Sequence, residues 1–261
     1  TIYSPKRLVA NVELAERSLQ LADHCSLVGN KYTLSTYPQK YHAKITPVNI
    51  SGSVLRYKKS PKDFVPQEKE FLWFFGSGAV HKGLDLVLDV FLKNKDLKLN
   101  IVGNAVEEKD FLLVYKDKIE RSPNITYHGY LHPQSKEFTE ITRRCFCFVA
   151  TSCSESTSSA CATCLQAGLY PIISYDCGVT LPQNCGIYLK TCSHEEIESA
   201  LSAVYHEPTE SLAKQIQSCQ ARALQNYSRQ AFSKRMTNFL QSAIGSQHAF
   251  EKNKKSSFVS I

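Results

Sequence analysis

The sequence predicts an α/β protein built on a doubly wound, Rossmann-like parallel sheet, with further helices trailing behind it. From residue 70 to 190, short apolar runs alternate with helical stretches of roughly ten to fifteen residues, which is the pattern of βαβ units. Several of the apolar runs are continuous and end at a glycine, as strands buried on both faces do. Because crossovers between parallel strands are right-handed, such units wind into one sheet with helices on both faces.

Fewer helices and strands are expected before residue 70. Apolar spacing favours a helix over 11–22 and another over 31–37, and short apolar runs favour strands over 25–28 and 43–50. Residues 51–69 contain two prolines and little apolar periodicity, so we expect a linker there.

The regular part of the pattern supplies the sheet and its helices. The strands are expected at 71–75, 97–102, 125–128, 145–150, 171–174 and 186–189. The helices are expected at 83–92, 107–119, 135–144, 158–167, 194–205, 209–226 and 229–243. Glu108 lies at the start of one of them, where a carboxylate suits the positive end of the helix. Ligands of doubly wound sheets bind outside the carboxyl ends of the strands, so we expect the chemistry in the loops after Phe75, Val102, His128 and Ala150.

The composition excludes several classes of protein. No apolar run reaches the length of about 18 residues that a membrane span requires, and the amino-terminal segment lacks the apolar region of a secretory signal. The 10 cysteines lie mostly in apolar runs, which favours reduced thiols in a cytoplasmic protein over a disulfide scaffold. No basic stripe with interleaved aromatic residues is present, so we expect no nucleic-acid partner.

The basic residues are concentrated in two places. The net charge is +7, and part of it lies in the stretch from Arg56 to Lys69. Another part lies in a C-terminal tail over 246–261 that we expect to be flexible. A mild basic excess fits a peripheral contact with an anionic membrane, a phosphorylated ligand, or no charged partner at all. The chain begins with Thr1 and its only methionine is Met236, which leads us to expect a piece of a longer protein.

The loop from Gly76 to Gly83 runs from a strand into a helix. Its glycines let the backbone approach a ligand closely, and the free N–H groups at the helix start attract an anion, to which Lys82 adds a cation. The spacing matches neither a P-loop nor GxGxxG. A phosphate site is favoured over the alternative, a tight connection with an exposed lysine.

A second candidate loop is Ser152–Ser159, which follows the apolar strand 145–150. Its hydroxyl residues can cap the next helix and offer donors to a ligand. The carboxylate of Glu155 is suited to accept hydrogen bonds from sugar hydroxyls. Taken alone, simple helix capping with a solvated Glu155 explains this loop equally well.

Together the two loops resemble the C-terminal domain of retaining GT-B glycosyltransferases. The family motif G-[RS]-x4-K-G-x-D is present as Gly76-Ser77-x4-Lys82-Gly83-x-Asp85, and S-x2-E as Ser152 and Glu155. A strand ending in Gly103 and the run Gly168-x2-Pro171-Ile172-Ile173 keep the family's order. The resemblance divides the chain into a remnant of an N-terminal domain (1–50), a linker (51–69), a nucleotide-sugar-binding domain (70–226), a C-terminal helix (227–245) and the tail (246–261). Most of the N-terminal domain is then missing.

The resemblance implies a glycosyltransferase that moves a sugar from a nucleotide sugar to a glycan or lipid-linked acceptor, without a metal or other cofactor. Lys82 would contact the donor diphosphate and Glu155 the donor sugar, and these two are the catalytic candidates. The donor-binding residues that the resemblance implies are Gly76, Ser77, Gly78, Lys82, Gly103, Tyr130, Glu155, Ser156, Thr157, Ser158 and Thr163. The protein is expected in the cytoplasm, where it could also contact the surface of the inner membrane.

Three departures from the family pattern support an alternative function. Ser77 stands where the family usually has arginine, and Ser156–Ser158 stands where it has Gly-Phe-Gly. Thr163 occupies the second position of E-x7-E, where a glutamate usually binds the ribose. The alternative is therefore a catalytically inactive GT-B-like module that binds a nucleotide sugar.

Other candidates carry less weight. A zinc site would have to join the pair Cys161 and Cys164 to Cys145 and Cys147, and buried thiols are the favoured explanation. His128 and the nearby His132 are expected to be ordinary strand-end histidines. A nucleotide-sugar epimerase would need a cluster of carboxylates and histidines that the sequence does not reveal, and a dehydrogenase would need GxGxxG.

Overall fold

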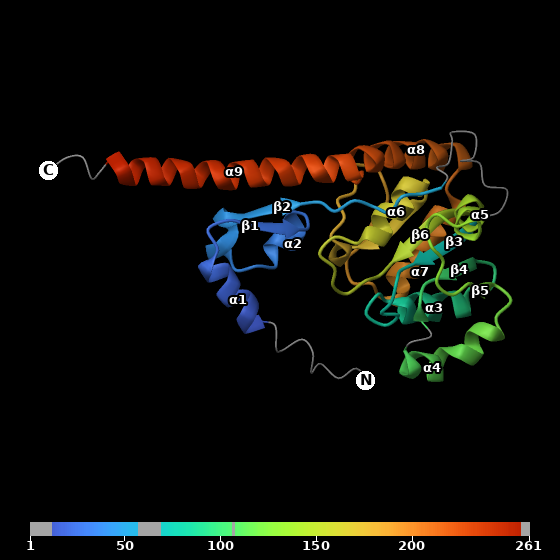
Figure 1. Cartoon of the computed structure of the whole chain (residues 1–261). Coiled ribbons are helices and arrows are strands. Elements are labelled where there is room, and N and C mark those ends of the chain that lie inside the picture. Colours follow the sequence, from blue (N-terminus) through green and yellow to red (C-terminus); the bar gives the residue numbers. More distant parts are fainter. Residues whose placement is uncertain (1–11, 57–68, 106–107, 257–261) are drawn as a thin grey trace.

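A computed structural model describes residues 12–56, 69–105 and 108–256 (Figure 1). Its main unit contains a six-stranded sheet of order β5-β4-β3-β6-β7-β8, in which every neighbouring pair is parallel. The strands are β3 (Glu70–Phe74), β4 (Lys98–Val102), β5 (Ile125–Tyr127), β6 (Cys145–Ala150), β7 (Tyr170–Ser174) and β8 (Ile187–Leu189). The doubly wound parallel sheet that the sequence predicts is confirmed.

The strand order decides where a ligand can bind. The chain starts in the middle with β3, adds β4 and β5 on one side, and then crosses over to place β6, β7 and β8 on the other. The order therefore reverses between β3 and β6, and ligands of doubly wound sheets bind outside the carboxyl ends of the strands at such a point. The loops after β3 and β6 are the same two that carry the sequence motifs.

An α-helix follows each strand of the main unit except β7, after which the chain makes only the 3-10 helix η6 (Tyr175–Cys177) before β8. The α-helices lie at the expected places to within about two residues. They are α3 (Leu84–Lys93), α4 (Lys109–Glu120), α5 (Lys136–Arg144), α6 (Ser159–Ala167), α7 (His194–His206) and α8 (Thr209–Asn226). Ser135, Ser158 and Ser193 each cap a helix by accepting a hydrogen bond from the backbone N–H three residues further on.

The core lies on both faces of the sheet. Every residue of β3, β6 and β7 is buried. The ring of Phe71 meets Phe91 of α3 and Phe146 of β6 edge to face, with centroids 5.5 Å and 4.9 Å away. Phe74 points to the opposite face and packs on Phe138 of α5 at 4.8 Å. Helices α3 and α5 therefore cover opposite faces of the sheet.

A smaller unit precedes the sheet. It consists of α1 (Val12–Leu21), β1 (Cys25–Val28), α2 (Lys31–Ser35), a 3-10 helix η3 (Gln39–Lys44) and β2 (Ile45–Val48), with β1 and β2 parallel. The strand expected over 43–50 is shorter than predicted, because the chain after Pro38, whose φ of −58° suits the start of a helix, first makes η3. Leu27, Tyr41 and Ile45 form a separate core in this unit.

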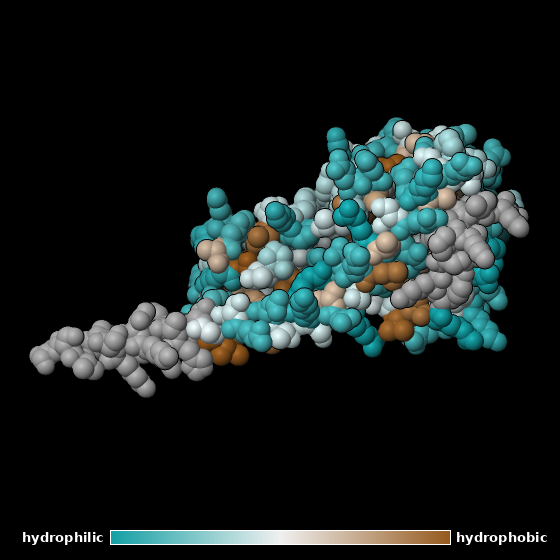
Figure 2. Space-filling model, turned by 90° about the horizontal axis from the view of Figure 1, so that it is seen from above, coloured by the Kyte–Doolittle hydropathy of each residue, from teal (hydrophilic) through white to brown (hydrophobic). Residues whose placement is uncertain are grey.

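Helix α1 is unusual in that none of its residues is buried. Its apolar side chains Val12, Leu14 and Leu21 are 67%, 64% and 75% exposed. Elsewhere the surface seen in Figure 2 is mainly hydrophilic, with separate hydrophobic patches. Exposed apolar side chains gathered on one helix are typical of a surface that contacts further protein.

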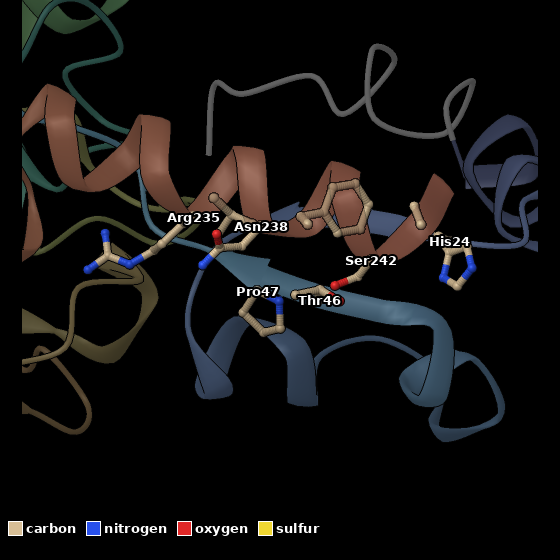
Figure 3. Close-up of a pocket in the computed structure, with 9 residues that line it drawn as sticks. His24, Thr46, Pro47, Arg235, Asn238 and Ser242 are labelled. Atoms are coloured by element: carbon tan, nitrogen blue, oxygen red, sulfur yellow. The ribbon is translucent and has the colours of Figure 1, made fainter. Parts of the chain in front are cut away.

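Helix α9 (Arg229–Ser256) joins the two units, since it follows α8 of the main unit and passes over the small one (Figure 1). A groove of about 260 Å³ lies between α9 and β2, with Arg235, Asn238 and Ser242 on one side and Thr46 and Pro47 on the other (Figure 3). No helix in the described ranges is both long and apolar enough to cross a membrane.

The C-terminal boundary expected at residue 245 does not coincide with a helix end. Helix α9 continues to Ser256, because residues 246–256 contain no proline and include the helix-forming residues alanine, glutamine, glutamate and lysine. Residues 257–261 of the expected tail and 57–68 of the expected linker lie outside the described residues.

Candidate functional site

The loop between β3 and α3 is folded tightly against the end of β6. Gly83 caps α3 in the left-handed conformation, with φ of 71°, and a Cβ there would lie 2.3 Å from Oγ1 of Thr151. That hydroxyl donates a hydrogen bond of 2.8 Å to the Gly83 carbonyl. Within the loop, the N–H of Lys82 donates to the carbonyl of Gly78 at 2.7 Å. A glycine at position 83 is therefore required for the two loops to approach each other.

The structure brings together the two charged residues that the sequence singled out. Nζ of Lys82 forms an ion pair with Oε1 of Glu155, 73 positions further on. The side chains are only 16% and 17% exposed, and the ammonium group lies 5.7 Å from the ring centroid of Phe75. His81 contributes a second link, since its Nε2 lies 2.8 Å from the Ser154 carbonyl. The carboxyl ends of β3 and β6 thus carry a partly buried cation beside a carboxylate.

Glu108 is a member of this site that sequence reasoning missed. Its carboxylate does not cap α4 but accepts hydrogen bonds from the backbone N–H groups of Ala79 and Val80, the latter at 3.5 Å. Two consecutive N–H groups of the β3–α3 loop therefore already face an anion. The sequence indicated only a favourable charge at the helix start, because nothing local links position 108 to a loop so far away.

The β6–α6 loop presents fewer free groups than expected. Ser156 is exposed, whereas Thr157 and Ser158 are 6% and 2% exposed. Oγ1 of Thr157 is buried without a hydrogen-bond partner among the described residues. Oγ of Ser158 accepts a hydrogen bond from the N–H of Cys161 and so caps α6. Of these three hydroxyls, only that of Ser156 is open to solvent.

Removing the cap of α6 is expected to destabilise the domain modestly. Ser158→Ala leaves the buried N–H of Cys161 without its acceptor, and the free energy of unfolding should fall by about 1 kcal/mol. Urea denaturation of Ser158→Ala and of the control Ser159→Ala, whose side chain is exposed, measures this. Equal midpoints for the two variants would contradict the capping role.

Thr163, the position implied for the ribose, lies away from any surface. It is 0% exposed. Its hydroxyl donates to the Ser159 carbonyl at 2.6 Å and accepts from the N–H of Ser53 at 2.9 Å. The chain leaving the small unit covers this face of α6, so the hydroxyl is already paired and is not exposed to a ligand. The structure does not support a ribose contact at Thr163.

The remaining implied residues differ in their surroundings. Gly103 is buried, and a Cβ there would lie 2.5 Å from the Phe75 carbonyl, so this glycine permits close packing of β4 on β3. Gly76 and Ser77 are exposed in the loop after β3, and Gly78 is half-buried with φ of 90°. Tyr130 is 59% exposed. These four residues are accessible at the carboxyl edge of the sheet.

His128 is more than an ordinary strand-end histidine. Its Nε2 lies 2.9 Å from Oδ1 of the buried Asn100, whose amide donates to Glu70 at 2.8 Å. Because the Asn100 amide nitrogen points to a carboxylate, its oxygen accepts, and Nε2 of His128 must carry the proton. Burial, followed by the Arg144 guanidinium, lowers the pKa of His128 below its ordinary value.

The lowered pKa predicts a pH dependence of stability. The unfolded chain takes up a proton as the pH falls through about 6.5, whereas the folded protein resists until the pH is lower. The stability that neutral His128 contributes is therefore present above that pH and is lost as the pH falls through the folded-state pKa. Thermal denaturation between about pH 8 and about pH 5 should show a smaller loss for His128→Gln than for the wild type. His132 is exposed, so His132→Gln should lose as much stability as the wild type over this pH range. If His128→Gln and His132→Gln lose the same amount, His128 is not the source of the pH dependence.

The cysteines are free thiols. Cys145, Cys147, Cys161 and Cys164 are all buried, and burial raises the pKa of Cys147, Cys161 and Cys164. Across the described part of the chain, no three or more histidine, cysteine or acidic side chains gather as a metal site would require.

A doubly wound parallel sheet, with a lysine from the β3 loop paired to a glutamate from the β6 loop at the switch point, is the arrangement expected of the Rossmann-like domain of the GT-B glycosyltransferases. The chain belongs to the family described as glycosyl transferases group 1, which matches residues 56–222 and so more than half of it. The resemblance seen in the sequence is confirmed, and glycosyl transfer is the activity of this family. A search of the curated proteins found no match.

Solved structures agree on the fold. Alr3699/HepE from Anabaena, in complex with UDP and glucose, matches with a TM-score of 0.71 and 16% identity over 92% of this chain and 68% of that one. The sucrose-phosphate synthase tll1590 from Thermosynechococcus elongatus matches with a TM-score of 0.72 and 11% identity, over 91% and 62%. A glycosyltransferase from Rickettsia africae matches with a TM-score of 0.67 and 12% identity, over 94% and 68%.

Proposed function

We propose that this chain binds the nucleotide-sugar donor of a glycosyltransferase at the carboxyl ends of β3 and β6, and that the sugar passes to a glycan or lipid-linked acceptor. One observation carries the proposal. Lys82 and Glu155 come from different loops and meet, partly buried, at the reversal point of the strand order, where ligands of such sheets bind. The UDP and glucose named in the Anabaena complex are in keeping with it.

The proposed chemistry uses the charges of Lys82 and Glu155. When the sugar leaves the donor, negative charge develops on the departing diphosphate. The ammonium group of Lys82 neutralises that charge, and the low exposure of the pair strengthens the attraction because little water screens it. Glu155 exchanges its bond to Lys82 for hydrogen bonds to the sugar hydroxyls. Lys82 takes the place that a metal ion has in other transferases, so the proposal requires no metal or other cofactor.

Nucleotide binding is the property to measure first. Thermal unfolding is followed with UDP, GDP, ADP and TDP, and a nucleotide present at about one hundred times its Kd should add about 2.7 kcal/mol to the free energy of unfolding. The proposal expects one of the four to raise the melting temperature clearly above the others. If all four leave the midpoint of the folded protein unchanged, the donor site proposed for this chain is wrong.

A second candidate is a GT-B-like module that binds a nucleotide sugar without transferring the sugar. The burial of Thr163 favours it, since the position that would hold the ribose offers no accessible group. An assay for hydrolysis of a nucleotide sugar, made with the nucleotide that stabilises the protein, distinguishes the two candidate functions. Slow release of free sugar that depends on Glu155 supports the transferase, whereas binding without any turnover supports the module.

We also propose that α1 packs against further protein of an N-terminal domain. The exposure of Val12, Leu14 and Leu21 supports this, as does the two-stranded sheet of the small unit, since so small a sheet is marginally stable alone. A cytoplasmic location, with a peripheral contact to the inner membrane surface, completes the proposal. The free thiols of the 10 cysteines fit a reducing compartment.

A further inference from the structure

Helix α2 of the small unit contacts the loop after β7, and it lies on the side of the small unit that faces the sheet (Figure 1). Thr33 of α2 is 8% exposed, and its hydroxyl donates a hydrogen bond of 2.9 Å to the carbonyl of Ser156. The two residues are 123 positions apart. Ser156 is the neighbour of Glu155, so this bond links the small unit to the loop that carries the candidate sugar ligand.

The Ser156 carbonyl is also confined from the other side. Gly178 has φ of 62°, and a Cβ at this position would lie 1.9 Å from the Ser156 oxygen. Two residues further along the loop, the N–H of Ser158 donates to the carbonyl of Cys177 at 2.9 Å. The segment after Glu155 is therefore held between the turn at 177–178 and α2.

The hydroxyl of Thr33 is fixed by its place in α2. It accepts a hydrogen bond from the N–H of Asn30 at 3.3 Å, while Oδ1 of Asn30 accepts from the N–H of Thr33 at 3.0 Å. This reciprocal pair caps the helix. The proton of the hydroxyl has two acceptors within reach, Oδ1 of Asn30 at 3.2 Å and the Ser156 carbonyl at 2.9 Å, and the Ser156 carbonyl is the nearer.

A second contact holds α2 in this position. The hydroxyl of Tyr32 donates to Oδ1 of Asp176 at 3.1 Å. Its ring lies 5.5 Å from the ring of Tyr175, which stacks on Tyr188 at 4.4 Å with an interplanar angle of 3°. Three aromatic rings thus connect α2 to the loop after β7, on the same edge of the sheet as the candidate site.

We propose that Thr33 is a positioning residue for the donor site: it holds the Glu155–Ser156 segment from the small unit in the conformation that binds the nucleotide sugar. The inference rests on the proposed function, because it concerns the same loop. Docking of α2 then completes the site, and displacement of the small unit releases the segment after Glu155. Thr33 touches neither diphosphate nor sugar and acts only through Ser156.

The test compares three variants of α2. Thr33→Val keeps the shape but lacks the hydroxyl, and Thr33→Ser keeps the hydroxyl. Thr36→Val is the matched control, because the Thr36 hydroxyl donates to the Thr33 carbonyl of its own helix at 2.7 Å. The Kd of UDP, GDP, ADP or TDP, whichever binds the wild type, should weaken about twofold to tenfold in Thr33→Val, the usual effect of one neutral hydrogen bond. Thr33→Ser should restore it, and Thr36→Val should leave it unchanged.

A second measurement needs no nucleotide. Hydrogen exchange of the free protein, followed in the peptide that spans 152–158, should be faster in Thr33→Val than in the wild type, Thr33→Ser and Thr36→Val. If no nucleotide binds the wild type, the proposed function fails, and the exchange experiment alone decides whether Thr33 positions the loop. Equal exchange in all variants, or equal nucleotide affinity in Thr33→Val and Thr36→Val, overturns the inference.

Discussion

Replacing Lys82 with alanine is expected to remove nearly all stabilisation by the nucleotide. A hydrogen bond to a charged group contributes about 1.5 to 3 kcal/mol, so the Kd should rise by about a factor of one hundred at the upper end of this range. At a nucleotide concentration of about one hundred times the wild-type Kd, the added free energy should fall from about 2.7 to about 0.4 kcal/mol. The shift in melting temperature should shrink from roughly 5 to 10 °C to about 1 °C.

The experiment must distinguish the loss of nucleotide binding from the loss of stability that the substitution itself causes. Lys82→Ala leaves the partly buried carboxylate of Glu155 without its partner, so each shift is measured against the same variant without nucleotide. Lys93→Ala is the control, because Lys93 is an exposed lysine at the far end of α3, the helix that follows the Lys82 loop. A Lys82→Ala protein that keeps the full shift would show that the diphosphate binds elsewhere.

Gly83→Ala is expected to destabilise the protein more than any other single glycine replacement at the β3–α3 loop. The left-handed φ of 71° costs a residue with a Cβ about 1 to 2 kcal/mol. The new Cβ would in addition lie 2.3 Å and 2.4 Å from the side-chain and backbone oxygens of Thr151, so the end of β6 or the start of α3 must shift. We expect a total loss of about 3 to 5 kcal/mol in the free energy of unfolding.

Replacing two other glycines distinguishes the cost of the left-handed backbone from the cost of the steric clash with Thr151. Gly129 has the same φ of 71° but nothing within 4 Å of its Cβ position, so Gly129→Ala should lose only about 1 to 2 kcal/mol. Gly76 has neither a left-handed backbone nor a neighbour, and Gly76→Ala should be close to neutral. Urea denaturation of the three variants tests the ranking. A Gly83→Ala variant no less stable than Gly129→Ala would disprove the close approach of the two loops.

The sequence located the elements of the main unit because their signals are local. Strands β3 and β6 are continuous apolar runs, and serines mark the starts of α5, α6 and α7. The pairing of Lys82 with Glu155 could be expected as well, once both were assigned to loops at the carboxyl ends of parallel strands. Only the strand order β3-β6, however, makes those two strands neighbours.

The errors of the sequence analysis concern residues whose partners are distant in the chain. Thr163 has the right spacing from Glu155, yet the backbone of Ser53 covers its hydroxyl. Glu108 suits a helix start, yet its carboxylate binds a loop 29 positions away. No periodicity or motif signals such contacts, because they arise only when elements distant in sequence pack together.

The sequence by itself therefore determined the class of the fold, the positions of its strands and helices, and the two loops that carry Lys82 and Glu155. These follow from apolar periodicity, helix caps and glycines, which act over a few residues. The tertiary structure alone decided which hydroxyls remain open to a ligand, which amides already face a carboxylate, and that Thr33 of the small unit holds the loop after Glu155. Burial and hydrogen-bond partners depend on how the whole chain packs, and the order of the residues does not reveal that packing locally.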